Sequence, residues 1–163
     1  MRASSRISFA RTVLPVWLAT AVWDFVCATA LSVFAYGSTA AALWRAVAAT
    51  ALGPSAVPSG AAGVAAGIAV HFAVALTWAS LFILAARTWA ALREAIRTPG
   101  GAFAVAAVYG PVIWLVMSLI VIPLATSKPP TIGTRWWIQV GAHIPFVTLP
   151  LVFTARRALA KEP

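Results

Sequence analysis

Acidic side chains are scarce in this 163-residue chain, which holds only three Asp and Glu residues. Glu94 and Glu162 fall outside the long apolar runs, so we expect both of them in solvent. Acid–base chemistry that uses two carboxylates is therefore excluded. The sequence also lacks a nucleophile elbow, a phosphate-binding loop and a dinucleotide fingerprint. Neither an enzyme activity nor a cofactor is indicated.

Cysteine and charge are almost as scarce. Cys27 is the single cysteine, so an internal disulfide is impossible. Charged residues make up 9% of the chain, against about a quarter in ordinary globular proteins. What the chain has instead is apolar: 62% of its residues are hydrophobic, and its mean hydropathy is +0.93. This composition is typical of an integral membrane protein in contact with a lipid bilayer.

Basic residues outnumber acidic ones, with twelve Lys and Arg and a net charge of +9. In a soluble protein this excess would suggest nucleic acid as a partner. Here the basic residues cluster at the ends of apolar runs, where they act as topology signals. No polar domain is present that could carry a nucleic-acid surface, so nucleic-acid binding is not expected.

Four apolar runs reach the length of about 20 residues that a membrane-spanning helix needs. They are Val13–Tyr36, Gly60–Ala86, Ala102–Ala125 and Trp136–Phe153. The segments between them are too short to fold separately. We therefore predict one all-α domain over residues 1–163, an integral membrane bundle of four transmembrane helices.

Two connecting segments are also expected to be helical without crossing the membrane. Ala40–Leu52 ends at Gly53-Pro54 and suits a short helix in the outer interface. Arg87–Arg97 suits a juxtamembrane extension of the second span on the cytoplasmic side.

The distribution of basic residues predicts the orientation. Nine of the twelve lie in the N-terminal segment, the second loop and the C-terminal tail, and three lie in the other loops. The majority are expected inside, so both termini face the cytoplasm of a bacterium and the protein lies in its inner membrane. The basic start followed by an apolar run could be read as a secretory signal. Asp24 interrupts that run, which favours a retained first span.

Three ionisable residues fall near the middle of their spans: Asp24, His71 and His143. At a rise of 1.5 Å per residue, Asp24 would lie about 1 Å from the midplane and the two histidines about 3 Å from it. A polar group at this depth costs several kcal/mol unless it is paired. We expect the three side chains to meet inside the bundle as a midplane polar cluster.

Neighbouring residues support this inward direction. Gly63 and Gly67 share a helix face with His71 and form a close-approach motif, so this face should pack on another helix. Gln139 lies one turn from His143 and adds a second polar group to that face.

Three roles for the cluster stay open. It could be a hydrogen-bonded group that fixes helix packing, a proton or ion relay, or a ligand set for a metal or haem. The two histidines are too far apart in the sequence to form a known metal-binding motif such as HxxxH or HExxH, so no motif supports the ligand set.

Prolines in the third and fourth spans are the other candidate feature. Each removes a backbone hydrogen bond and predicts a kink that frees the carbonyl group four residues earlier. They are Pro111, Pro123, Pro145 and Pro150, and the freed carbonyls would be those of Ala107, Leu119, Gly141 and Phe146.

The second half of the chain resembles uncharacterised bacterial membrane proteins with four predicted spans. The resemblance covers roughly residues 65 to 157 and depends on recurring Gly, Pro and aromatic positions. Its residues are His71-Phe72, Ala75, Tyr109-Gly110, Trp114, Met117, Pro123-Leu124, His143 and Leu149-Pro150. It implies a four-helix inner-membrane protein and no particular activity.

Together these observations favour a small polytopic membrane protein that acts as an accessory or assembly subunit. We expect it to work in a homo-oligomer or a membrane protein complex, with the Asp24/His71/His143 cluster organising the bundle. The alternatives are a small proton-coupled transporter or channel, and a haem- or metal-binding redox protein.

Overall fold

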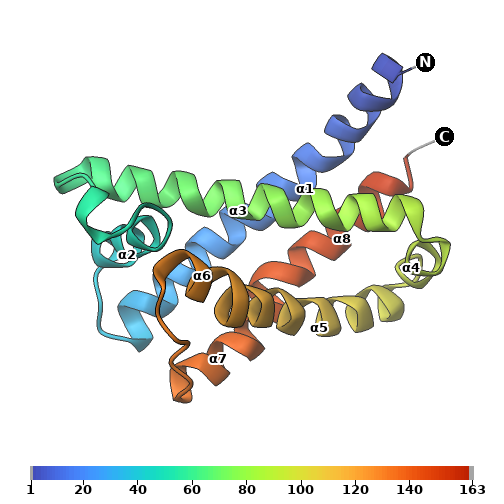
Figure 1. Cartoon of the computed structure of the whole chain (residues 1–163). Helices are drawn as coiled ribbons and strands as arrows, with labels where there is room; N and C mark the ends of the chain where they lie inside the picture. The colour runs from blue at the N-terminus through green and yellow to red at the C-terminus, as the bar shows by residue number, and fades with distance from the viewer. Residues whose placement is uncertain (1, 162–163) are drawn as a thin grey trace.

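The computed structural model describes residues 2–161 of the chain. Within that range it is all-α, with four long apolar helices and a shorter fifth helix (Figure 1). The four long helices cover Phe9–Ala35, Gly60–Thr88, Pro99–Thr126 and Thr134–Leu159, and each is long and apolar enough to cross a bilayer. The predicted four-span fold is thus confirmed. Each of the four helices runs beyond at least one of its predicted bounds, because residues that flank the apolar run also adopt helical structure.

Three of the four spans contain a wider, π-helical turn. The first span is α1 (Arg2–Ala30) followed by η1 (Leu31–Ala35). The second, α3 (Gly60–Thr88), is one uninterrupted helix. The third is α5 (Pro99–Val116), η3 (Met117–Val121) and α6 (Ile122–Thr126). The fourth is α7 (Thr134–His143), η4 (Ile144–Thr148) and α8 (Leu149–Leu159).

Helix α2 (Ala40–Leu52) packs against the first half of α3. The Thr39 hydroxyl caps its first turn by accepting a hydrogen bond from the Ala42 amide, 3.1 Å away. At the other end Gly53 has a φ of 83°, which lets the chain leave the helix towards the short 3₁₀ turn η2 (Pro54–Ala56). The helix predicted for residues 40–52 is therefore present.

Gly67 is where α2 and α3 come closest. A methyl group at this position would overlap the backbone carbonyl of Trp44, and one at Gly63 would overlap the Pro58 carbonyl. The close-approach motif on the His71 face therefore does pack on another helix. That helix is the short α2, which the spacing of the glycines could not identify.

The segment after α3 differs from the prediction of a continuous extension. Helix α3 ends at Thr88, Trp89 is extended, and a separate helix α4 (Ala90–Ala95) follows. The Arg93 Nε donates a hydrogen bond to the Ala86 carbonyl, 3.2 Å away, so this side chain satisfies the end of α3. The turn brings Ile96 into the core, where it is 2% exposed.

The best-packed core lies in the half of the bundle nearest the termini, between α1, α3, α5 and α8. Its largest fully buried side chains include Val16, Ile83, Leu151 and Val152. Small residues such as Ala79, Ala86, Ala102, Ala106 and Ala155 let these helices approach closely. In a bilayer this close packing, rather than removal from water, is what favours helix association.

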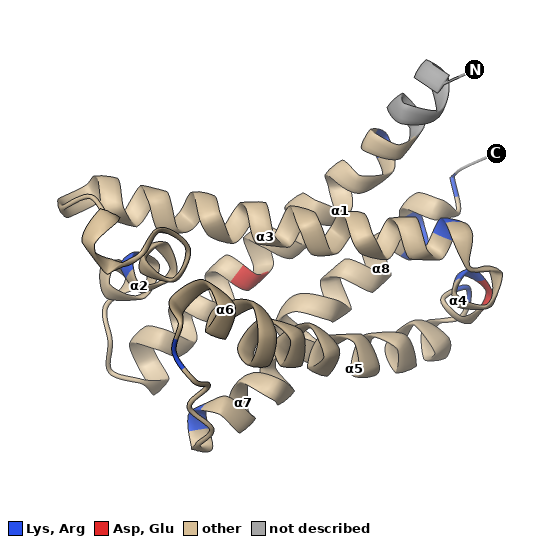
Figure 2. Cartoon of the chain, viewed as in Figure 1, with Lys and Arg blue, Asp and Glu red and all other residues tan. Residues whose placement is uncertain are grey.

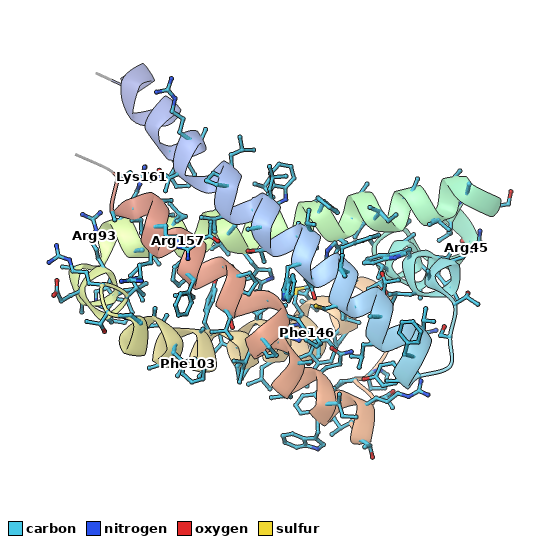
Figure 3. All side chains as sticks on the ribbon, turned by 180° about the vertical axis from the view of Figure 1, so that it is seen from behind. Arg45, Arg93, Phe103, Phe146, Arg157 and Lys161 are labelled. Atoms are coloured by element: carbon cyan, nitrogen blue, oxygen red, sulfur yellow. The ribbon has the colours of Figure 1, made fainter. Side chains whose placement is uncertain are left out.

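Both termini lie at the same end of the bundle, beside α4 (Figure 1). Lys and Arg residues gather at the two ends of the molecule, and the spans between them carry almost none (Figure 2). Seen from behind, Arg93, Arg157 and Lys161 lie at the end with the termini, and Arg45 lies at the opposite end (Figure 3). The acidic residue midway along α1 is Asp24.

A candidate binding cavity within the membrane spans

A cavity of about 320 Å³ lies among α1, α2, α3 and the third and fourth spans. Its volume falls at the lower end of the range of small-molecule sites. Most of its wall is apolar, formed by side chains such as Val74, Ile113, Met117 and Val147. Its ionisable or hydroxyl-bearing residues are few: Thr20, Asp24, Thr50, His71 and His143. All three candidate residues predicted at the midplane therefore border one cavity.

Asp24 and His71 form a pair that joins α1 to α3. The Nδ1 atom of His71 lies 3.8 Å from a carboxylate oxygen of Asp24, and both side chains are largely buried. The other ring nitrogen, Nε2, lies 3.0 Å from the backbone carbonyl of Ala21. A carbonyl oxygen can only accept, so Nε2 must carry a hydrogen. In the neutral ring Nδ1 then carries a lone pair, which faces a carboxylate oxygen of Asp24. The contact is favourable only when one further proton is present, either on Nδ1 or on the carboxyl group.

Aromatic rings enclose this pair on the α2 side. The Trp44 ring lies 5.1 Å from the His71 ring and stacks on Phe25 at 4.8 Å, measured between ring centres. The Phe72 ring lies 5.6 Å from His71 on its own helix. These contacts hold the imidazole in one orientation, and α2 supplies the covering ring.

His143 stands apart from the pair. Its Nδ1 lies 2.7 Å from the Gln139 carbonyl one turn earlier, so Nδ1 is the donor and Nε2 is left as an acceptor. Its ring packs on Trp114, with 5.0 Å between ring centres. Gln139 thus contributes its backbone carbonyl to His143.

The predicted three-residue cluster is therefore not formed. Among residues 9–161, no three His, Cys, Asp or Glu side chains lie close enough together to hold a metal ion. Asp24 and His71 meet, whereas His143 borders the same cavity and bonds to its own helix. Positions along the spans give the depth of each side chain but not its direction around the bundle, and direction decides which groups touch.

The prolines of the fourth span coincide with π-helical turns. Pro145 lies inside η4 and Pro150 comes two residues after it, just as Pro123 comes two residues after η3. A π-turn has a wider backbone and tolerates the missing amide hydrogen of proline. Pro111 instead lies within the regular helix α5. The predicted kinks at these four prolines stay a prediction.

Thr148 binds the third and fourth spans together beside Gly110. Its hydroxyl donates to the Ala106 carbonyl at 2.7 Å and lies 3.2 Å from the His143 carbonyl. A methyl group at Gly110 would meet this hydroxyl at 2.8 Å. The backbone of His143 is therefore used for helix packing. Thr148 was not among the residues predicted from the sequence, although a Thr inside an apolar span signals a hydrogen bond to a neighbouring carbonyl.

Two tryptophans also border the cavity, Trp114 and Trp78. Trp78 has a second role because it also borders an apolar groove of about 680 Å³ between α3 and α5. The Tyr109 hydroxyl donates to the Trp78 carbonyl at 3.4 Å, and their rings lie 6.0 Å apart. This contact between α3 and α5 separates the cavity from the α3/α5 groove.

Comparison of the chain with protein-family models, with curated proteins and with solved structures found no match. The four-span part of the resemblance agrees with the fold, and no family is identified. What the chain and its structure establish is a small polytopic membrane protein.

Proposed function

We propose that this membrane protein is an accessory subunit that holds an apolar small molecule in its intramembrane cavity. The observation that carries the proposal is the wall of that cavity, which is apolar except for a few polar groups that face it from several helices. A cavity that served packing alone would be filled by side chains, because helix association in lipid depends on close contact.

The polar groups of the cavity wall indicate which chemical group the ligand would carry. The Asp24 carboxylate can accept a hydrogen bond, and the Nε2 atom of His143 is an acceptor once Nδ1 has donated to Gln139. The complementary ligand is an apolar molecule that carries a hydrogen-bond donor, such as a hydroxyl or amino group.

The fluorescent amine 1-aminoanthracene has this chemistry and can be titrated into the protein in nanodiscs. We expect saturable fluorescence with the wild-type protein, and loss of that signal with Val74→Phe, which would fill the cavity. The matched control is Leu84→Phe on the same helix, where the side chain is 51% exposed on the outer surface. Asp24→Asn should weaken binding of the amine about tenfold and leave binding of anthracene unchanged, because hydrogen bonds to charged groups contribute about 1.5–3 kcal/mol. Equal signals from wild type and Val74→Phe would contradict the proposal.

A proton-coupled transporter is the second candidate, and the Asp24–His71 pair favours it. A proton can be held either by His71 Nδ1 or by the Asp24 carboxyl group, and both side chains border the cavity. In proteoliposomes with a pH-sensitive dye inside, Asp24→Asn and His71→Ala should each abolish proton flux while Lys128→Gln should leave it unchanged. The absence of flux through the wild-type protein would eliminate this candidate.

The redox alternative receives the least support from the geometry. Both ring nitrogens of His71 face protein groups, the Ala21 carbonyl and the Asp24 carboxylate. An axial haem ligand needs one of these nitrogens free. An absorption spectrum with a Soret band, or stoichiometric iron in the purified protein, would reverse this ranking.

A further inference from the structure

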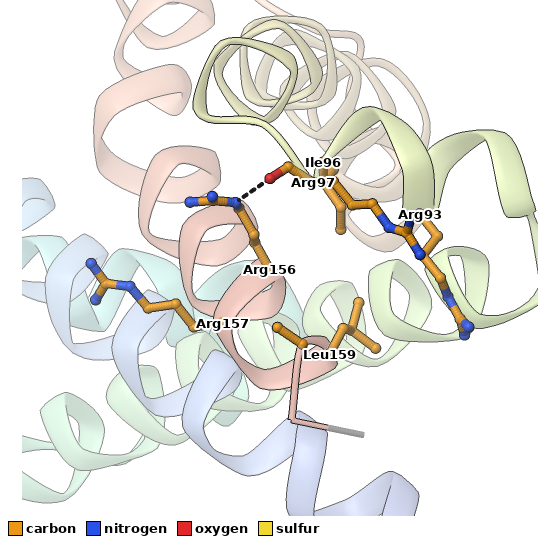
Figure 4. Close-up of a pocket in the computed structure, with 7 residues that line it drawn as sticks. Arg93, Ile96, Arg97, Arg156, Arg157 and Leu159 are labelled. Carbon is orange, nitrogen blue, oxygen red and sulfur yellow. Dashed lines mark hydrogen bonds between the residues drawn. The ribbon is translucent and has the colours of Figure 1, made fainter. Parts of the chain in front are cut away.

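Four arginines line a cleft of about 540 Å³ at the end of the bundle that holds the termini. Two come from the region of α4 and two from the last turns of α8, and Ile96 and Leu159 form an apolar floor (Figure 4). The four are Arg93, Arg97, Arg156 and Arg157, and we call this site the basic cleft.

Two of these side chains are held in place by hydrogen bonds from Nε to backbone carbonyls. The Arg156 Nε donates to the Arg97 carbonyl at 2.9 Å, and the Arg93 Nε donates to the Ala86 carbonyl at 3.2 Å. Because Nε makes the Arg156 bond, both Nη groups of Arg156 can donate elsewhere. The Nη2 group of Arg93 also donates to the Arg87 carbonyl, 3.5 Å away, which leaves the Nη1 group of Arg93 for a ligand. Anchoring of this kind lowers the entropy cost of ordering a long side chain around a ligand.

The cleft has little negative charge of its own. Glu94 is the one acidic side chain near it within the described residues, and it forms an exposed ion pair of 2.9 Å with Arg97. Orienting the protein in a membrane requires only that basic residues lie on one side. It does not require that four arginines line one cleft or that backbone carbonyls anchor two of them.

The position of the cleft indicates its ligand. It lies where α3 and α8 end and α5 begins, which is the level of the lipid headgroups when the four helices span a bilayer. Guanidinium groups bind phosphate with particular strength, and basic sites between helix ends on the cytoplasmic side hold anionic headgroups. We infer that the basic cleft binds a phosphate group, which an anionic phospholipid supplies within the membrane and soluble phosphate could supply from water.

Native mass spectrometry of the full chain in neutral detergent tests this inference, with phosphatidylglycerol and phosphatidylcholine as probes. The variant is Arg93→Gln with Arg156→Gln. The matched control is Lys128→Gln with Arg135→Gln, which removes the same charge from the segment that leads from α6 into α7, away from α4 (Figure 1).

We expect one phosphatidylglycerol to bind in preference to phosphatidylcholine, and the cleft variant to weaken that binding at least tenfold while the control does not. Competition by millimolar inorganic phosphate would assign the site to the phosphate group alone, and lack of competition would assign it to the whole lipid headgroup. Equal binding of the two lipids, or equal losses in the cleft variant and its control, would overturn the inference. Size-exclusion profiles identify a variant that fails to fold, and in that case the single change Arg157→Gln replaces the double variant.

Discussion

The polar residues inside the spans differ in how well the sequence predicts their hydrogen-bond or ion-pair partners. Asp24, His71 and His143 were predicted to meet as one cluster, and only Asp24 and His71 lie close together, with 3.8 Å between the carboxylate oxygen and Nδ1. His143 found a different partner, the Gln139 carbonyl on its own helix. That bond joins residues four positions apart on one helix. Whether the His143 ring binds this carbonyl or the Asp24 carboxylate nevertheless depends on how α7 is rotated towards its neighbours.

Gly67 offers the sharpest test at this scale. In Gly67→Ala the added methyl group would overlap the Trp44 carbonyl, so we expect a loss of about 1–3 kcal/mol in the free energy of unfolding. The measurement is thermal unfolding in detergent, followed by size-exclusion chromatography. Gly141→Ala is the matched control, because nothing lies within 4 Å of a methyl group there. Equal stability of the two variants would mean that α2 does not approach α3 at this point.

At the scale of elements, the short helix α2 has the largest effect on the candidate site. It packs on the first half of α3, contributes Val47, Thr50 and Ala51 to the cavity wall, and places the Trp44 ring beside His71. An amphipathic helix in the interface would account for its composition equally well. Whether α2 packs on α3 or lies in the interface depends on the small residues of α3 that it approaches, Gly63 and Gly67, which lie more than ten positions from Trp44 in the sequence.

Removing the Trp44 ring should release α2 from α3. Trp44 is 2% exposed, so Trp44→Ala leaves a gap against Phe25 and His71 and should cost about 3 kcal/mol. Hydrogen exchange of the α2 amides should then rise markedly, while exchange in α8 should stay as it is. Trp137→Ala is the control, since this side chain is 64% exposed. Unchanged protection of α2 in the Trp44 variant would refute its role as the anchor.

For the whole molecule, the arrangement of charge and helices leads to a prediction about orientation. The two termini and α4 lie at one end (Figure 1). Helix α2, which contains Arg45, and the segment from α6 into α7, which contains Lys128 and Arg135, lie away from that end. An excess of Lys and Arg marks the cytoplasmic side of a membrane protein. We therefore propose that the end with the termini faces the cytoplasm of a bacterial inner membrane.

Cysteine labelling in whole cells tests this orientation. In a Cys27→Ser background, a cysteine at Ser55 or Ser127 should react with a membrane-impermeant maleimide, because both residues are exposed in loops at the opposite end. A cysteine at Ala160 should react only after the membrane is broken. The reverse pattern would place the termini outside.

The sequence by itself determined the class of this protein and its four spans, because a bilayer requires about 20 apolar residues per crossing and places charges at the ends. It also predicted a common depth for Asp24, His71 and His143, since rise along a helix is fixed. Tertiary structure alone decided how each helix is rotated about its axis, where α2 packs, and how the Arg93 and Arg156 side chains border one cleft. Those outcomes depend on contacts between segments distant in the chain, and lipid offers an apolar side chain no strong preference for one neighbour over another.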